Sequence, residues 1–426
     1  MKLFFSVGEP SGDLHGANLI AEFARHRADV QAVGFGGPRM AAAGRELMQD
    51  MTDLAVMGLV PAVVRLPKFL ALLGAAKQSL QVDRPDAVVL IDFPGFNWHI
   101  AKAAKALGIP VFYYGLPQVW AWASWRVKKV RRYVDHALVK LPFEEQWFRE
   151  RGCNATYVGH PYFDELRTRQ LDPAFIAGLT NDNRRLVTIL PGSRRQEVLA
   201  NLPTLLKAAE IIAARIPDVR FAIASYNEAQ ATMAREQVAR VKLPVDVHVG
   251  RTAELIHAAQ ICLACSGSVS LELLYHAKPS VILYKVNRLL YSAVRRLMST
   301  RYITLVNLLA ADRSAFTNGE PYDRISAEHA KVLFPEYPTY QDKSAEIAEH
   351  AIEWLGDEAA RQALVARLTA LRERVGAGGA SQLAAEYILR ELDLKQPIAR
   401  PHFSVQIHPL PLGEGRGEGA AAAPQR

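Results

Sequence analysis

The sequence MKLFFSVGEPSGDLHGANLI, residues 1–20, places an apolar run before a glycine-rich loop and a helical pattern. This order is typical of a strand, a phosphate-binding turn and a helix in an α/β protein. The glycines are spaced G-x-x-x-G-x-x-x-G, however, and the stretch lacks both G-x-G-x-x-G and G-K-[ST]. The carboxylates of Glu9 and Asp13 would also repel a pyrophosphate. We therefore expect a nucleotide to bind elsewhere.

Short apolar runs alternate with helical patterns along most of the chain. In the first half we predict strands at 2–8, 29–37, 86–93, 110–116, 135–141 and 155–159, with helices at 14–27, 60–80, 97–108 and 124–133. In the second half we predict strands at 185–192, 219–225, 245–250, 260–267 and 280–286. These strands are apolar on both faces, as a helix-covered parallel sheet requires. Two βαβ series predict two doubly wound domains that face a cleft.

The chain length of 426 residues also favours two domains. We place the first at residues 1–170 and the second at 183–375, with a polar linker between them. After a glycine-rich hinge, a helix at about 380–395 is expected to pack back on the first domain. The Gly-, Pro- and Ala-rich tail, 396–426, is predicted to be disordered.

Composition narrows the class of protein. Three cysteines argue against a disulfide scaffold and for a reducing compartment, and no signal peptide is recognisable. A net charge of +8 indicates an anionic partner, although no nucleic-acid-binding motif is present. Leu54–Ala76 is the most apolar segment, but Arg65 and Lys68 interrupt it. It is too broken to span a membrane, and either a core helix or a surface lying on a membrane fits it.

Two loops of the second half are candidates for a nucleotide site. Each loop follows a predicted strand and precedes a helix, and the backbone N–H groups and dipole at a helix start favour phosphate. The residues are Gly192, Ser193 and Arg194 in one loop and Ser266, Gly267 and Ser268 in the other. Arg194 or Arg195 can contact a diphosphate, and Glu272 can accept ribose hydroxyls. Ordinary βα turns are the alternative for either loop alone. Two such loops at one end of one sheet favour the nucleotide.

Ten segments between residues 7 and 310 are similar to motifs of a known protein family. In order they are VGEPSGDLHGANL, GFGGPRM, LAVMGLVPAVVRLP, LIDFPGFN, QVWAW, LPFE, YVGHP, LPGSRRQEV, SGSVSLE and VNLLA. With them the chain resembles the lipid-A-disaccharide synthases, which are inverting glycosyltransferases of the GT-B fold. The resemblance implies a hexosyltransferase that joins UDP-2,3-diacylglucosamine to 2,3-diacylglucosamine 1-phosphate (lipid X). The products are a β(1→6) disaccharide 1-phosphate, in lipid A biosynthesis, and UDP.

The resemblance also bears on the donor side of the site. It adds Asn307, in VNLLA, to the substrate-binding residues. The chain departs from the family pattern after this point, so the family's Pro-Glu pair appears only at Pro335-Glu336, after an apparent insertion near 312–333. GT-B enzymes generally stabilise the leaving diphosphate without a metal. The sequence agrees, since no cluster has metal-ligand spacing, and we expect no cofactor.

Asp92 is the candidate general base. It ends the apolar run VVLI at the carboxyl edge of a strand, where partial burial suits proton abstraction, and it matches the family's essential aspartate. The structural alternative is a cap on the helix near Asn97. By elimination, the opening loop lies on the acceptor side, where Glu9 and Asp13 suit hydroxyls or a neighbouring base; they are the other two candidate catalytic residues, to which the proton transfer would pass if Asp92 were not the base. Ser11 and Gly12 are expected to hold a sugar oxygen, unless Ser11 or Asp13 is a simple N-cap.

Two other functions remain open at this point. One is a different GT-B enzyme, such as a UDP-N-acetylglucosamine 2-epimerase, which needs no hydrophobic entrance. The other is a non-catalytic protein that binds lipid or nucleotide at a membrane surface.

Because acylated substrates stay in the membrane, we expect a cytoplasmic enzyme that is peripheral on the inner face of the inner membrane. Basic runs at 126–132 and 295–301 would meet anionic lipid, and the tryptophans of WAWASW are either core or acyl contacts. The oligomeric state stays open.

Overall fold

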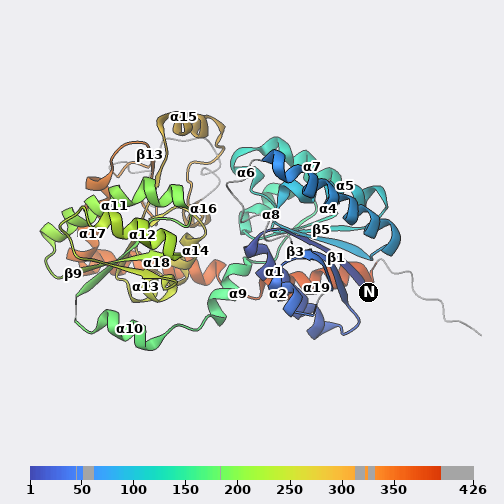
Figure 1. The fold of residues 1–426 in the computed structure, drawn as a ribbon, viewed down its shortest axis with the longest axis horizontal. Coiled ribbons are helices and arrows are strands. Elements are labelled where there is room, and N and C mark those ends of the chain that lie inside the picture. Colours follow the sequence, from blue (N-terminus) through green and yellow to red (C-terminus); the bar gives the residue numbers. More distant parts are fainter. Residues whose placement is uncertain (45, 51–61, 183, 312–321, 325–331, 395–426) are drawn as a thin grey trace, which may run out of the picture.

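The computed structural model describes the chain except residues 45, 51–61, 183, 312–321, 325–331 and 395–426. Two α/β domains lie side by side, each a parallel sheet covered by helices on both faces (Figure 1). The doubly wound, two-domain fold predicted from the sequence is confirmed.

The first sheet has seven parallel strands in the order β3-β2-β1-β4-β5-β6-β7. The strands are β1 (Lys2–Val7), β2 (Gln31–Gly36), β3 (Glu46–Asp50), β4 (Ala87–Ile91), β5 (Val111–Tyr114), β6 (His136–Val139) and β7 (Ala155–Tyr157). The helices are α1 (Pro10–His26), α2 (Pro38–Ala42), α4 (Ala62–Asp83), α5 (Pro94–Ala106), α6 (Val119–Trp122), α7 (Val127–Tyr133) and α8 (Pro142–Arg149). Sequence reasoning missed β3, an edge strand whose sequence ELMQD carries three polar residues and no β-branched one.

The second sheet has six parallel strands in the order β10-β9-β8-β11-β12-β13. They are β8 (Arg185–Leu190), β9 (Val219–Ser225), β10 (Val245–Val249), β11 (Ile261–Cys265), β12 (Ser280–Lys285) and β13 (Glu336–Thr339). The helices are α11 (Arg195–Arg215), α12 (Glu228–Val238), α13 (Thr252–Ala258), α14 (Val269–Tyr275), α15 (Arg288–Leu297), α16 (Leu305–Ala310), α17 (Ser344–Gly356) and α18 (Glu358–Val375). The missed strand β13 contains Pro338, which confines it to an edge of the sheet.

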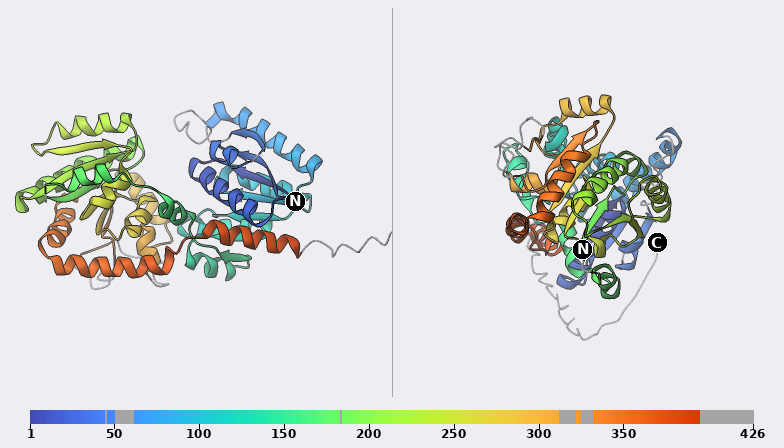
Figure 2. Two further views of the ribbon diagram at one scale, coloured as in Figure 1. Left: turned by 90° about the horizontal axis from the view of Figure 1, so that it is seen from below. Right: turned by 90° about the vertical axis from the view of Figure 1, so that its left-hand side faces the viewer.

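Three helices connect the domains: α9 (Pro161–Thr168), α10 (Pro173–Thr180) and α19 (Ala380–Asp393). Figure 2 shows α19 running from the second domain along the first, where it packs on α1. The carboxylate of Asp164, in α9, accepts the backbone N–H groups at the start of α19, from Gly379, Ala380 and Ser381. The chain passes between the domains once near α9 and once before α19, and Asp164 therefore links these two connections.

The buried strands explain why the first sheet must be covered on both sides. Phe4 and Phe5 are adjacent in β1 and point to opposite faces. Phe4 packs edge-on against Phe35 with ring centroids 5.9 Å apart, and Phe5 against Phe23 at 6.4 Å. All five residues of β4 are buried. Each face thus has its own apolar layer.

The apolar segment Leu54–Ala76 divides between two environments. Residues 54–61 lie outside the described part of the chain, and α4 covers the rest. Leu72 and Leu73 are buried in the core, whereas Leu66 and Leu70 are 52% and 54% exposed. In the part of the chain that the structure describes, no helix is both long and apolar enough to cross a membrane.

Candidate active site

The candidate residues converge because both sheets reverse their strand order at the cleft. In the first sheet the reversal lies between β1 and β4, and in the second between β8 and β11. Ligands in doubly wound sheets bind beyond the carboxyl ends of the strands at such a reversal. The loops there are the opening loop after β1, Asp92 after β4, the Gly192 loop after β8 and the Ser266 loop after β11.

The opening loop packs against the strand end that carries Asp92. A Cβ atom at Gly8 would lie 2.4 Å from the ring of Phe93, and one at Gly12 would lie 2.9 Å from Val7 and 3.8 Å from Oδ2 of Asp92. The glycines therefore give close packing to the first domain, not room for a phosphate. Helix α1 begins at Pro10, four residues before the predicted start at 14, since proline is favoured in a first helical turn.

Asp13 does not face the cleft. It is 3% exposed, and its carboxylate accepts the backbone N–H groups of Gly37, Arg39 and Met40 at 2.8 to 3.1 Å. These are the unpaired donors at the start of α2, so the geometry gives Asp13 a capping role in place of the proton transfer expected from the sequence. Ser11 is exposed in the first turn of α1 and is not its N-cap, which is Glu9.

Asp92 has a strained backbone at the end of β4. Its φ is +46° and that of Phe93 is +45°, a left-handed pair that costs free energy in residues other than glycine. The carbonyl of Asp92 accepts the side chain of Asn97 at 2.8 Å and the hydroxyl of Tyr113 at 2.7 Å. Strain held by such contacts is common where a side chain must be aimed.

The sequence predicted a helix that begins at Asn97, and the structure shows that this prediction was wrong. Helix α5 begins at Pro94, and Asn97 is fully buried within its first turn. Its amide donates to the carbonyls of Ser6 and Ile91 as well as to Asp92, and its oxygen accepts the Ser6 hydroxyl at 2.6 Å. Asn97 thus joins the ends of β1 and β4 beneath the candidate base.

Lys140 is the partner of Asp92 that sequence reasoning missed. Its Nζ lies 3.0 Å from Oδ1 of Asp92, and each side chain is only about one-fifth exposed. Burial lowers the pKa of Lys140, but the charge and hydrogen bond of Asp92 outweigh this and raise it above its usual value. Lys140 follows β6 directly, so the rule that identified Asp92, a charge at the end of an apolar strand, could also have found it.

Glu9 belongs to the same electrostatic group. Burial and then the charge of Asp92 raise its pKa, while Lys140 and Arg194 lower it.

Two histidines lie close enough to Lys140 for its charge to act on their pKa. Burial, with Lys140 second, lowers the pKa of His15 to about 4 and that of His160 well below its usual value. Both imidazoles are therefore neutral at pH 7, and Nδ1 of His160 accepts the N–H of Tyr162 at the start of α9.

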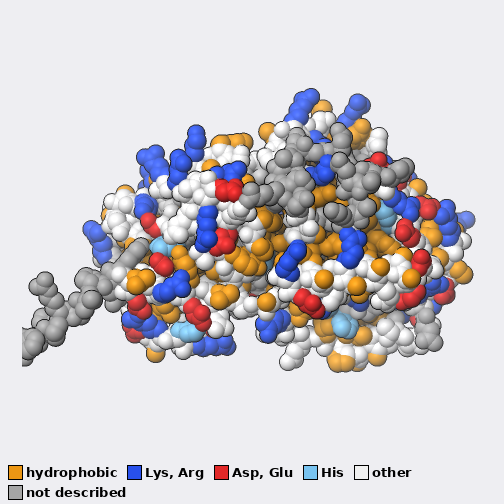
Figure 3. Space-filling view, turned by 180° about the vertical axis from the view of Figure 1, so that it is seen from behind, with side chains coloured by type: hydrophobic (Ala, Val, Ile, Leu, Met, Phe, Trp, Pro, Cys, Tyr) orange, Lys and Arg blue, Asp and Glu red, His pale blue; other side chains and the backbone are white. Residues whose placement is uncertain are grey.

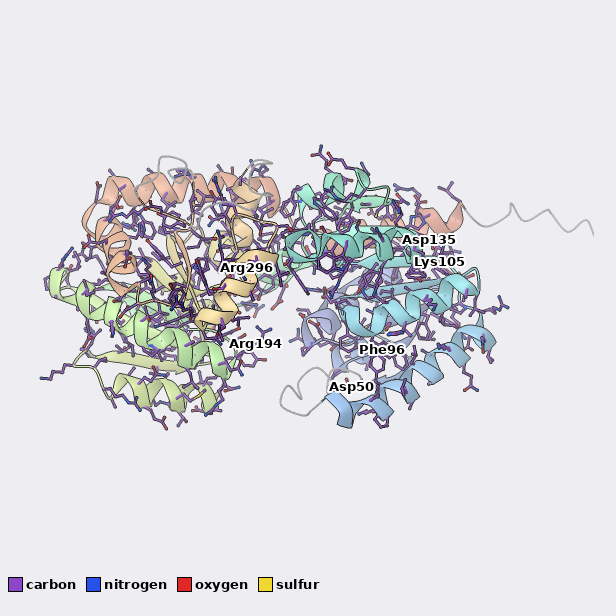
Figure 4. The ribbon with its side chains drawn as sticks, turned by 90° about the horizontal axis from the view of Figure 1, so that it is seen from above. Asp50, Phe96, Lys105, Asp135, Arg194 and Arg296 are labelled. Atoms are coloured by element: carbon purple, nitrogen blue, oxygen red, sulfur yellow. The ribbon has the colours of Figure 1, made fainter. Side chains whose placement is uncertain are left out.

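Across the cleft, the loop of Gly192, Ser193 and Arg194 is closed by a carboxylate. Glu197 accepts the backbone N–H groups of Ser193 and Arg194 at 2.9 and 3.0 Å and pairs with the Arg194 guanidinium at 2.8 Å. A phosphate would have to displace Glu197 to reach those donors. The guanidinium is 80% exposed on the side of the second domain next to the first (Figure 4). Arg194 can thus contact a ligand in the cleft.

The second loop is open. Ser266 is half-buried, Gly267 and Ser268 are exposed, and Gly267 has a φ of +155° with open space where a Cβ would be. It follows β11, the neighbour of β8, so the two loops expected from the sequence do meet at one edge of the sheet.

Glu272 lies deeper than the sequence implied. It is 3% exposed, its Oε2 accepts the hydroxyl of Tyr162 at 2.6 Å, and its Oε1 pairs with Arg169 at 2.6 Å. Tyr162 and Arg169 belong to the crossing between the domains. In this structure Glu272 therefore joins the second domain to that crossing, and a ribose would compete with both partners.

Asn307 is also a structural contact in this structure. It is 2% exposed, and its amide donates to Phe334 and Glu336 while its oxygen accepts the N–H of Phe334. Glu336 accepts the N–H groups of Ile303 and Thr304, and burial raises its pKa to about 7. This pair holds α16 on the edge strand β13. Most of the apparent insertion at 312–333 lies outside the described residues.

No cluster of three or more His, Cys, Asp or Glu in the described ranges has the arrangement to hold a metal ion. The groups that can act on a substrate here are the pair of Asp92 and Lys140, Glu9 beside them, and Arg194 opposite. This arrangement can accept a proton on one side of a cleft and stabilise an anion on the other.

Comparison with known proteins decides the family. Residues 3–347 match the family model described as lipid-A-disaccharide synthetase. The chain belongs to this family. A lipid-A-disaccharide synthase from Syntrophus aciditrophicus is 35% identical over 381 residues, which cover 89% of this chain and 94% of that one. The prediction of a glycosyltransferase of lipid A biosynthesis is confirmed, and the epimerase and non-catalytic alternatives are not favoured.

Solved structures agree on the fold. A UDP-GlcNAc 2-epimerase from Neisseria meningitidis, solved with UDP-GlcNAc bound, superposes with a TM-score of 0.59 at 12% identity and covers 92% of this chain and all of that one. The calicheamicin glycosyltransferase CalG4 superposes with a TM-score of 0.55 at 17% identity and covers 93% of this chain and 99% of that one. At such low identity the chain is similar to both in its GT-B architecture alone.

Proposed function

We propose that the protein joins UDP-2,3-diacylglucosamine to 2,3-diacylglucosamine 1-phosphate and releases UDP. The observation that carries this proposal is the ion-paired, strained Asp92 at the strand reversal of the first sheet, opposite Arg194, in a chain of this family. The test is to incubate the purified protein with both lipids in detergent micelles. UDP and a tetraacyl disaccharide 1-phosphate should appear together, and no release of UDP above the enzyme-free control would refute the proposal.

In this proposal Asp92 takes the proton of the acceptor 6-hydroxyl. The acceptor oxygen then forms a bond to the donor anomeric carbon with inversion, and the bond from that carbon to the diphosphate breaks. The electron pair leaves with UDP, whose charge Arg194 and the two loops offset. Lys140 keeps Asp92 oriented between proton transfers, and Glu9, Ser11 and Gly12 form the acceptor side.

The domain roles follow from this arrangement. We assign residues 1–170 with α19 to the acceptor side and residues 183–375 to the UDP-sugar. The pair of switch-point loops, at Gly192 and at Ser266, supports the second assignment because both lie at the same edge of the sheet. Glu272 and Asn307 reach the donor only if closure of the cleft frees them from their present partners.

Arg194→Ala should weaken UDP binding and leave acceptor binding nearly unchanged. A hydrogen bond to a charged group contributes about 1.5–3 kcal/mol, so the Kd for UDP should rise roughly 10- to 150-fold. Isothermal calorimetry with UDP measures this. The matched control is Arg195→Ala, since Arg195 is also exposed and begins α11. A larger effect of the Arg195 variant, or equal weakening of both ligands, would contradict the assignment.

We further propose that the protein works as a cytoplasmic enzyme on the inner face of the inner membrane, docked through the exposed face of α4. Leu66→Gln combined with Leu70→Gln should then reduce co-sedimentation with anionic liposomes several-fold at an unchanged melting temperature, because both side chains are about half exposed. Leu72→Gln, on the buried face, is the contrast and should lower the melting temperature. Undiminished liposome binding by the double variant would exclude this face.

A further inference from the structure

An apolar groove of about 280 Å³ lies between the domains, apart from the polar loops described above. One wall comes from α6 of the first domain, and the other from α15 and α16 of the second. The surface inside it is almost entirely apolar, and its walls include Trp120, Ala121, Trp122, Val294, Leu297 and Leu308. Such a site has little to offer a sugar or a phosphate, but it suits a hydrocarbon chain.

A chain of contacts connects this groove to the candidate base. The indole of Trp120 donates to Glu144 at 2.9 Å. Glu144 also accepts the backbone N–H of Lys140 at 3.0 Å, and Nζ of Lys140 reaches Asp92. Glu144 and Lys140 therefore connect a wall of the groove to the candidate base through one hydrogen-bonded network.

The opposite wall is held in place across the domain boundary. The N–H of Ser299, two residues after the end of α15, donates to the carbonyl of Ala121 at 2.7 Å. Glu336 fixes Ile303 and Thr304, which lead into α16.

Helix α15 carries the apolar lining outward. Leu290, Val294 and Leu297 follow each other at i, i+4 and i+7, which places them on one face, and their exposed fractions are 48%, 39% and 60%. The helix buries none of its ten residues. Figure 1 shows it at the top of the second domain, on the side next to the first domain. A continuous apolar path thus leads from solvent into the groove.

The flanking charges complement a phosphorylated lipid. Lys128 and Lys129 on α7, and Arg288 and Arg296 on α15, are exposed. Figure 1 shows both helices along the upper edge of the two domains. Figure 3 shows Lys and Arg side chains along this edge of both domains. An anionic headgroup would be attracted to that edge, while the chain attached to it needs an apolar surface.

We propose that this groove binds one acyl chain of a diacylglucosamine substrate while the sugar occupies the cleft at Asp92. The inference rests on the proposed function and adds the place where the substrate's chain is held. An acyl chain that leaves a bilayer exposes its methylene groups to water, and an apolar groove removes that cost. The second domain, through α15 and α16, then contributes to acyl recognition as well as to donor binding.

Leu297→Trp tests the groove by filling it. With a series of donors and acceptors that differ only in acyl length, kcat/KM for the longest chain should fall by about tenfold, because overpacking disfavours the larger ligand, while the shortest chain is spared. Leu289→Trp is the matched control, since Leu289 is on the same helix, is 84% exposed and does not line the groove. Its chain-length profile should equal that of the wild type.

If the dependence of kcat/KM on acyl length is unchanged in Leu297→Trp, the groove does not bind the acyl chain, although the proposed disaccharide synthesis is unaffected by that result. Equal shifts in both variants would also overturn the inference, because they would reflect contact of α15 with the micelle. Binding provides a readout that does not need turnover. A 2,3-diacylglucosamine 1-phosphate with brominated acyl chains should quench Trp120 and Trp122, which line the groove, but not the exposed Trp125. Quenching should therefore fall in Trp122→Phe and not in Trp125→Phe. Quenching that falls in Trp125→Phe and not in Trp122→Phe would exclude the groove even if the protein made no disaccharide.

Discussion

Asp92→Asn should lower kcat by about 10²- to 10⁴-fold and leave the Kd for UDP within twofold of the wild type. The amide keeps the shape of the side chain but cannot accept the acceptor proton. The donor loops at Gly192 and Ser266 belong to the other domain and do not change. Disaccharide formation measures the first effect and calorimetry with UDP the second.

Glu9→Gln is the companion to this variant. Glu9 lies in the field of Asp92 and Lys140, which makes it the alternative base. We expect Glu9→Gln to retain more activity than Asp92→Asn. The reverse order would move the base to Glu9. A melting temperature within a few degrees of the wild type in both variants is needed to exclude loss of Lys140 packing as the cause.

Glu272→Ala should lower the free energy of unfolding by about 1.5–3 kcal/mol, because Arg169 loses its buried partner and keeps only Glu165. The carboxylate is 4% exposed and also accepts the Tyr162 hydroxyl, so two contacts between the second domain and the crossing are lost together. Denaturant unfolding followed by tryptophan fluorescence measures the effect. Tyr162→Phe, which removes only the hydroxyl, should cost about 0.5–1.5 kcal/mol.

The same variant separates a structural role of Glu272 from the ribose contact. If Glu272 acts through the crossing, the loss of UDP affinity should be small in the folded protein and shared by Tyr162→Phe. A tenfold or greater loss of UDP affinity in Glu272→Ala at wild-type stability, with Tyr162→Phe unaffected, would instead restore the ribose contact predicted from the sequence.

The sequence alone determined the architecture, because strand and helix periodicity is local. Runs such as VVLI before Asp92 are apolar on both faces, and only a covered parallel sheet can bury them. It also placed Asp92, Gly192 and Ser266 at the carboxyl ends of strands, which parallel pairing brings to one edge. The sequence did not predict the edge strands β3 and β13, because an edge position tolerates polar residues and proline, which weaken the strand pattern.

Which charged groups meet depends on how the strands and helices pack in three dimensions. Lys140 pairs with Asp92 from 48 residues away because β4 and β6 are both neighbours of β5 in the sheet. Asp13 caps α2 in place of facing the cleft, and Glu272 is occupied by Arg169 from the crossing between the domains. The sequence shows that each of these groups is charged. Whether such a group reaches a substrate or a backbone N–H depends on strand order and helix docking, since Coulomb and hydrogen-bond energies act over a few ångströms of space and not along the chain.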